Sequence, residues 1–241
     1  MKNNTKLIAG IAGTVLVVAV IMVTVLNKVN GDLDVIGQGS FRSFGEVLEA
    51  ASGQLEADEA NGGWSLSAPD QSARFVWSQD YSKSPGYDVM LEFDAKPFLD
   101  AGLDAASLPE SYTVADEKLV VGSDLGDEAL VYEVEPTALE AYGQIVKKHR
   151  SAVSYHMGGD HYGVGIGHGN GVEWANDLEM NMTSKEAQDK DLVFVLNPEP
   201  LIAAGVDPEK VEGWKYAVVH GASHGGKTTE SYKFLKPVSL D

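Results

Sequence analysis

The chain has 241 residues, of which 44% are hydrophobic and 22% are charged, a composition typical of a folded protein rather than a disordered one. The first 30 residues hold three of its 18 basic residues and none of its 36 acidic ones, so residues 31–241 carry 15 basic and 36 acidic residues. Such an acidic surface repels phosphate backbones and argues against a nucleic-acid partner. The absence of cysteine excludes thiolate metal sites and a lipid anchor on an N-terminal cysteine.

The first predicted element is an uncharged run of twenty residues, Leu7–Leu26, long enough to cross a bilayer of about 30 Å as a helix. Lys2 and Lys6 precede it, so the positive-inside rule places the N-terminus in the cytoplasm and the rest of the chain outside. A cleaved signal peptide would have a shorter apolar region and a small-x-small site, which this run lacks. We predict that residues 1–30 form a cytoplasmic tip and an uncleaved, single-pass transmembrane anchor in contact with lipid through residues 7–26. Residues 27–42 then read as a tether.

The rest of the chain contains two similar stretches, LEFDAKPFLDAGLD at Leu91–Asp104 and FVLNPEPLIAAGVD at Phe194–Asp207. In each, a strand is predicted to end near a polar cap, Asp94 or Asn197. A proline then falls in the first turn of a short helix, and a glycine ends that helix. The shared proline, alanine, glycine and aspartate positions indicate an internal duplication.

A longer amphipathic helix is predicted ahead of each stretch, at residues 43–51 and 137–145. Each begins with the spacing of a capping box, Ser43 with Glu46 and Thr137 with Glu140. The apolar positions recur at helical spacing on one face of each helix. They are Phe44, Val47, Leu48 and Ala51 in the first helix, and Ala138, Ala141, Tyr142 and Ile145 in the second.

Between and after these helices, period-2 alternation such as YDVMLEF and WKYAVV predicts half-buried antiparallel strands. Two paired strands run to Trp77 or Trp174, which we expect to be core residues, and a third strand precedes each short helix. We therefore predict an α+β fold with an N-terminal transmembrane helix and two tandem α-β-β-β-α-β-β units. The first α+β repeat spans residues 31–136 and the second spans residues 137–241.

The string Gly221–Thr228 matches the phosphate-loop pattern G-x-x-x-x-G-K-[ST]. A phosphate loop requires a following helix, whose N-terminal amides hold the phosphates. The residues after Thr228, TESYKFLKP, have a strand pattern that ends at Pro237. We predict a hairpin loop and no nucleotide partner.

Histidine is distributed unevenly, because all six histidines lie in the second repeat: His149, His156, His161, His168, His220 and His224. Imidazoles near carboxylates such as Asp160, Glu173 and Asp177 are typical of zinc, copper or nickel sites. The main candidates for metal ligands are His161, His168, His220 and His224. The alternative is that these histidines are scattered at the surface, since no pair has metal spacing on a helix. No cofactor is required by the sequence, although a divalent metal is compatible with it.

Glycines alternate in the same region, at Gly163, Gly165, Gly167, Gly169 and Gly171. On one continuous strand they would leave one face bare, so that a helix, an aromatic ring or a flat ligand could approach the backbone. Small residues at comparable positions of the first repeat, Ser65 and Ser67, favour close packing of a helix over the sheet.

No catalytic motif is found, since there is no G-x-S-x-G and no cysteine nucleophile. The sequence therefore favours a membrane-anchored, extracytoplasmic binding or accessory subunit of the cell envelope without catalytic activity. A cleft between duplicated halves would be a natural place for a ligand or for a partner membrane or envelope protein. Two alternatives stay open: a metal-binding protein or metal-dependent extracytoplasmic enzyme that uses the histidines of the second repeat, and a surface-filament subunit.

Overall fold

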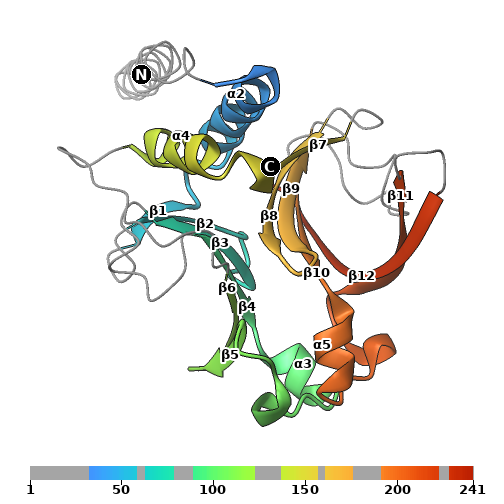
Figure 1. The fold of residues 1–241 in the computed structure, drawn as a ribbon. Helices are drawn as coiled ribbons and strands as arrows, with labels where there is room; N and C mark the ends of the chain where they lie inside the picture. Colours follow the sequence, from blue (N-terminus) through green and yellow to red (C-terminus); the bar gives the residue numbers. More distant parts are fainter. Residues whose placement is uncertain are drawn as a thin grey trace, which may run out of the picture.

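The computed structural model describes residues 33–58, 63–78, 89–122, 137–156, 161–175, 191–222 and 228–240. These residues form two six-stranded antiparallel sheets with a few helices, which confirms the predicted α+β class (Figure 1). The predicted transmembrane segment Leu7–Leu26 lies outside the described residues. Within those residues, no helix has the length and hydrophobicity needed to cross a bilayer.

The first half of the chain forms the first sheet, whose strand order is β1-β2-β3-β4-β6-β5. Its elements are α2 (Val35–Ala50), β1 (Leu55–Asp58), β2 (Gly63–Ser67), β3 (Ala73–Ser78), β4 (Val89–Asp94), α3 (Lys96–Asp100), the 3-10 turn η2 (Ala105–Ser107), β5 (Tyr112–Ala115) and β6 (Lys118–Gly122).

The second half forms the second sheet, with the order β11-β12-β10-β9-β8-β7. Its elements are α4 (Ala138–Lys148), η3 (Arg150–Ala152), β7 (Val153–His156), β8 (His161–Gly167), β9 (Asn170–Ala175), β10 (Asp191–Leu196), α5 (Pro198–Ala203), η4 (Pro208–Lys210), β11 (Lys215–Ala222) and β12 (Thr228–Val238).

The two halves have the same topology: a long helix, four strands, a short helix and two strands, with the last strand inserted beside the fourth. This correspondence supports the predicted duplication. Each half has one strand more than the predicted unit, because β1 and β7 were not recognised. Both are four-residue strands at a sheet edge, too short for alternation to be visible in the sequence.

The first long helix begins earlier than predicted. Asp34 is its N-cap, and the carboxylate oxygen Oδ1 of Asp34 accepts a hydrogen bond from the backbone nitrogen of Gly37 at 2.7 Å. Ser43 and Glu46 therefore lie inside α2, so the predicted capping box there is wrong, as is the tether as far as residue 42. The capping box of Thr137 and Glu140 is confirmed at the start of α4.

Each long helix packs against the sheet formed by the other half of the chain. α2 contacts β7, β8 and β9, whereas α4 contacts β2 and β3, and the two helices also contact each other. The indole nitrogen of Trp77 in β3 donates to the backbone oxygen of Ala138 in α4 at 3.0 Å. The halves therefore share one structure and one core, because neither sheet is covered by its own helix alone.

The core lies between the two sheets. Near α2 and α4, the ring of Phe44 contacts Trp77, Tyr142 and Trp174, with centroid distances of 5.3, 4.2 and 5.0 Å. Both tryptophans are fully buried, as predicted, and so are the apolar faces of the two helices. Further along the sheets, Phe93 of β4 meets Phe194 of β10 at 5.5 Å.

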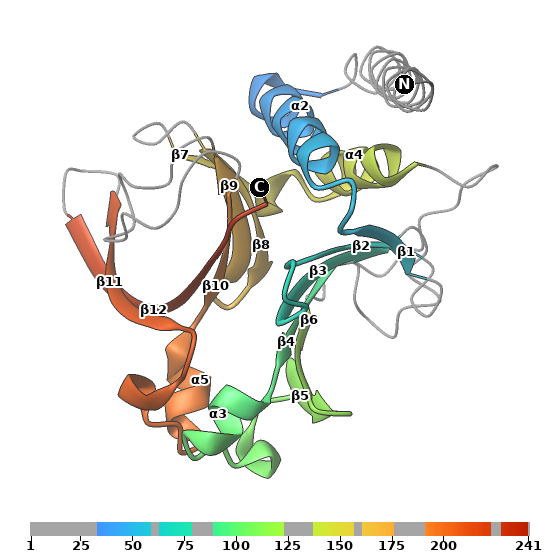
Figure 2. The same ribbon diagram turned by 180° about the vertical axis from the view of Figure 1, so that it is seen from behind.

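The opposite end of the molecule is closed by α3 and α5, which lie side by side in both views (Figures 1 and 2). The segments that follow them exchange two hydrogen bonds: the amide of Asp104 donates to the oxygen of Ala204 at 2.7 Å, and the amide of Asp207 to the oxygen of Ala101 at 2.9 Å. This reciprocal pair gives the junction the symmetry of an internal twofold axis. The predicted cap Asn197 and the two helix-ending glycines are confirmed here. At α3 the N-cap is Ala95 instead of the predicted Asp94, although the Asp94 carboxylate accepts a hydrogen bond from the backbone nitrogen of Lys96 at 3.0 Å.

Candidate functional site

The four histidines proposed as metal ligands do not converge in the described part of the chain. His161 begins β8 and His168 follows the end of the same strand, so about 20 Å of extended backbone separates them. His220 lies in β11, four positions away from β8 in the sheet order. His224 lies outside the described residues. Among the side chains that the structure describes, which do not include those of His156, His161, His220 and His224, no three or more metal-ligating residues lie together. The metal site therefore stays a prediction.

The strand register places a different histidine beside His161. In the β7–β8 pair, His156 is directly opposite His161, and Ser154 is opposite Gly163. In the β8–β9 pair, Gly163 is opposite Glu173. Positions 156, 161 and 173 therefore belong to the same face of the sheet, since residues two apart and cross-strand partners share a face. The sequence signal for this pair is H-x-x-x-x-H around the Gly158-Gly159 dipeptide, which suits a hairpin turn better than a helix.

Among the described residues, no α-helix lies over the glycines of β8, which differs from the sequence-based expectation of a helix packed on them. The inward face of the second sheet carries Tyr162 and Val164, and α2 approaches that face. A Cβ atom added to Gly39 of α2 would collide with the Tyr162 hydroxyl. Gly163 and Gly165 belong to the opposite, outer face, because side chains alternate along a strand. The close approach of helix and sheet therefore depends on a glycine of the helix.

On the outer face of the second sheet, the described residues of β8 are the glycines Gly163 and Gly165. A Cβ at Gly163 would lie 2.9 Å from the Cγ atom of Glu173, and a Cβ at Gly171 would lie 2.6 Å from the backbone oxygen of Val164. Val193, on the same face of β10, is fully buried. These glycines therefore let neighbouring strands and the Glu173 side chain pack closely.

A strained turn joins β8 to β9. Gly167, His168 and Gly169 have φ angles of 89°, 52° and 78°, so three successive residues are in the left-handed region. The alternation of glycines does not continue along one strand, as the period-2 pattern suggested, because the chain reverses here. His168 is exposed on this turn.

Two contacts anchor the turn to the rest of the molecule. The Nζ atom of Lys233 donates to the backbone oxygen of Gly169 at 3.0 Å. Burial lowers the pKa of Lys233, and the negative charges of Glu199 and Glu173 offset this effect only in part. The buried Asn170 accepts hydrogen bonds through Oδ1 from the amide of Asn197 at 2.8 Å and from the Tyr112 hydroxyl at 3.0 Å. Burial raises the pKa of Tyr112. The hydrogen bond from Tyr112 to Asn170 links the turn to the first half of the chain.

The phosphate-loop-like string lies in a hairpin. Its first two residues, Gly221 and Ala222, end β11, and Thr228 begins β12 directly opposite Ala222. The segment 223–227 lies outside the described residues. A strand of eleven residues follows in place of the helix that a phosphate loop needs, which confirms the hairpin prediction.

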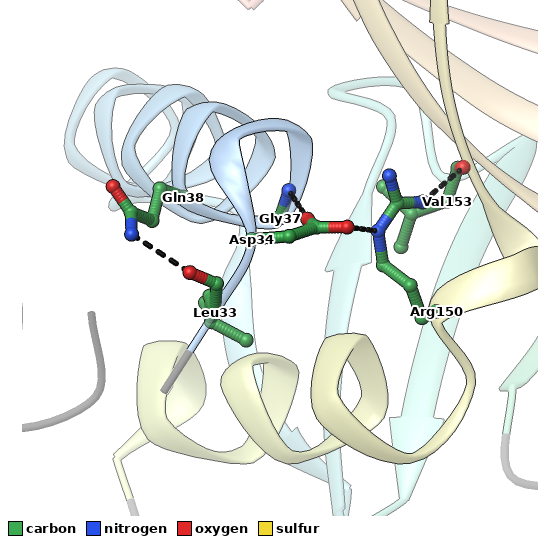
Figure 3. A network of polar contacts seen from close by, with 6 residues as sticks. All are labelled: Leu33, Asp34, Gly37, Gln38, Arg150 and Val153. Atoms are coloured by element: carbon green, nitrogen blue, oxygen red, sulfur yellow. Dashed lines mark hydrogen bonds and ion pairs between the residues drawn. The ribbon is translucent and has the colours of Figure 1, made fainter. Parts of the chain in front are cut away.

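A polar network holds the start of α2 to the second half (Figure 3). Besides accepting from Gly37, the Asp34 carboxylate pairs through Oδ2 with the Nε atom of Arg150 at 2.6 Å. Arg150 also donates through Nη1 to the backbone oxygen of Val153 at 3.2 Å, where β7 begins. The Gln38 side chain donates to the backbone oxygen of Leu33 at 2.7 Å. The hydrogen bond from Gly37 and the Arg150 guanidinium hold the pKa of Asp34 below its ordinary value.

Sequence reasoning did not identify this network, because its partners are 116 residues apart. The available signal was local: an aspartate three residues before a glycine, which suits an N-cap. Comparison with protein-family models, with curated proteins and with solved structures finds no match to this chain.

Proposed function

We propose that this chain is a single-pass membrane protein whose extracytoplasmic body is a non-enzymatic binding or accessory subunit of the cell envelope. The apolar run ends at Leu26 and α2 begins at Val35. The eight residues between them span at most about 28 Å when fully extended. A body joined to an anchor by so short a connection stays close to the membrane, where its partners would also lie.

The observation that carries this proposal is the network around Asp34. The chain enters the folded body at Leu33, and the next residue both caps α2 and pairs with Arg150, which leads into β7. Because α2 also packs across the second sheet, an anchor that precedes Leu33 would be connected to both halves through α2. This suits a protein that presents its body to a partner in a defined orientation.

The proposal is tested by extracting the full chain in mild detergent and measuring the mass of the particle by native mass spectrometry. We expect the chain to carry a stoichiometric partner protein or small-molecule ligand that survives purification. A solitary chain with nothing bound, obtained under conditions that preserve its fold, would contradict the proposal.

The register of β7, β8 and β9 favours one second candidate, a metal-binding protein. Positions 156, 161 and 173 share the outer face of the sheet, with only Gly163 between positions 161 and 173 on that face. Two histidines and a carboxylate form a ligand set used for zinc.

Elemental analysis of untagged full-length protein tests this candidate. His156→Ala and His161→Ala should each abolish stoichiometric metal, whereas His168→Ala, at the far end of β8, should retain it. A substoichiometric metal content that none of the three substitutions changes would contradict a metal-binding function.

A further inference from the structure

The start of α2 exposes apolar side chains. Val35 is 85% exposed and Ile36 is 37% exposed, although Leu33 beside them is buried. Exposed large hydrophobic residues are few among the described residues, and the others lie at Leu99, Ile202 and Tyr232. Val35 and Ile36 are the pair nearest in sequence to the predicted anchor, with eight residues between Leu26 and Val35.

Basic residues accompany this pair in an otherwise acidic protein. Arg42 is exposed and lies two turns after Val35 on the same side of α2. Lys147 and Lys148 lie in the last turn of α4, three and two residues before Arg150. Arg150 offsets the charge of Asp34 through their ion pair. We call Val35, Ile36, Arg42, Lys147 and Lys148 the α2 N-terminal surface.

Asp32 and Asp34 precede Val35 in the sequence, and Asp34 is paired with Arg150, whereas the other acidic residues of the two helices lie further away. Glu46 and Glu49 are 11 and 14 residues after Val35, which is about 16 to 21 Å along the helix axis. Glu140 lies in the first turn of α4, two turns before Lys147 and Lys148. Asp32 and Asp34 stand against four basic residues, Arg42, Lys147, Lys148 and Arg150, so this group has two more basic than acidic side chains, whereas the whole chain has a net charge of −18.

We propose that the α2 N-terminal surface lies against the lipid bilayer, with Val35 and Ile36 in its interfacial region and the basic side chains near anionic headgroups. This inference rests on the proposed function, because it needs the anchor to be in the membrane. A connection of eight residues brings the start of α2 within reach of the bilayer surface. Apolar side chains with basic neighbours are the combination that binds an anionic membrane interface.

The absence of native cysteine permits a site-specific test with the full chain. Three single-cysteine variants carry an environment-sensitive fluorophore: Val17→Cys within the anchor, Val35→Cys at the proposed contact, and Gly53→Cys beyond the other end of α2. Gly53 is a matched control, because a Cβ there meets no atom within 4 Å and about 24 Å of helix separates it from Val35. The protein is reconstituted in phosphatidylcholine vesicles with and without phosphatidylglycerol, and lipids with spin-labelled headgroups or acyl chains act as quenchers.

We expect headgroup quenching of Val35→Cys to exceed that of Gly53→Cys and to increase with phosphatidylglycerol. Replacing Lys147 or Lys148 with Gln should weaken the contact with the membrane. For each lysine replaced, we expect the ratio of molecules whose body contacts the membrane to molecules whose body does not to fall about fivefold. Lys96→Gln, on α3 at the opposite end of the molecule, should leave this ratio unchanged.

Three outcomes would overturn a proposal. If Val17→Cys is quenched by acyl-chain labels while Val35→Cys is quenched no more than Gly53→Cys, this inference fails but the proposed anchor is supported. If the fluorophore at Val35→Cys is as shielded from water in detergent as in vesicles and is not quenched by labelled lipid, the fluorophore contacts protein and the inference also fails. If Val17→Cys is not quenched, the proposed function itself fails.

Discussion

Single polar contacts connect the two halves of the chain at buried positions. Ser40 of α2 and Tyr142 of α4 share a hydrogen bond of 2.5 Å, and both side chains are fully buried. Burial raises the pKa of Tyr142 well above its ordinary value. The contact therefore behaves as a neutral hydrogen bond over the physiological pH range, and its partners come from helices 102 residues apart.

Removing one of the two hydroxyls, of Ser40 or of Tyr142, should destabilise the folded protein more than removing both. Tyr142→Phe leaves the Ser40 hydroxyl buried without its partner, and we expect a loss of about 1 to 3 kcal/mol in the free energy of unfolding. The double variant Ser40→Ala/Tyr142→Phe should recover part of that loss. Denaturant titration of the detergent-solubilised chain measures both. Additive effects of Tyr142→Phe and Ser40→Ala would show that the two hydroxyls are not coupled.

Asp34 should contribute a pH-dependent stabilisation. Its pKa is lowered in the folded state, so the contribution is present at pH values above the unfolded pKa and is lost as the pH falls through the folded pKa. Asp34→Asn keeps an oxygen that can cap α2 but loses the charge that pairs with Arg150. We expect a lower melting temperature for Asp34→Asn at neutral pH, with the difference from wild type closing in acid. A constant difference from neutral to acidic pH would contradict the assigned ion pair.

At the scale of elements, the two glycines that end α3 and α5 are interdependent. Gly102 and Gly205 have φ angles of 104° and 98°, and a Cβ on either would lie 2.8 Å from the backbone oxygen of the other. The matched geometry follows from the reciprocal hydrogen bonds at this junction. Glycine is needed here both for the left-handed backbone and for the close approach of two chain segments.

Alanine at either glycine should destabilise the protein to a similar extent. The left-handed conformation alone costs about 1 to 2 kcal/mol for an alanine, and the clash adds to it. Gly53→Ala, in open space, serves as the control and should change stability little. Unfolding midpoints of the three variants test this. A neutral Gly102→Ala would show that the junction is looser than described.

The sequence predicted those elements whose determinants are local. The proline and glycine of the short helices, the Thr137 capping box and the strand alternation each act within a few residues. The start of α2 was missed because Gly37, Gly39 and Ser40 are poor helix formers. Packing stabilises this turn instead, since Gly37 and Ser40 are buried and Gly39 lies against Tyr162.

The candidate sites show the same division between local and distant determinants. A histidine-rich second repeat was visible in the sequence, but which histidines are neighbours depends on strand register. His161 is opposite His156, although His156 was not among the main candidates for metal ligands. His161 is remote from His168, although both were main candidates. The exchange of α2 and α4 between the sheets could not be inferred, because an amphipathic face does not specify which sheet it covers.

At the scale of the whole molecule, this exchange makes the two halves one cooperative unit. Each sheet relies on the helix from the other half, and one apolar cluster includes residues of both. The division of the sequence at residue 136 therefore does not separate two independently covered cores.

We expect a single unfolding transition. Trp77 and Trp174 lie in different sheets, so the variants Trp77→Phe and Trp174→Phe each change the contribution of one half to the fluorescence signal. Within each variant, the midpoint from tryptophan emission should match the midpoint from circular dichroism. Separately expressed residues 31–136 and 137–241 should not fold on their own. Two resolved transitions, or a stable isolated half, would contradict the shared core.

Labelling of intact cells tests the proposal that an anchor holds this body on the outer side of a membrane. Gly53→Cys and Asn3→Cys are expressed separately in the cysteine-free chain and treated with a membrane-impermeant maleimide. We expect Gly53→Cys to react in intact cells and Asn3→Cys to react only after lysis, and we expect both variants to sediment with membranes. Labelling of Asn3→Cys but not Gly53→Cys in intact cells, or recovery of the chain in the soluble fraction, would contradict the proposal.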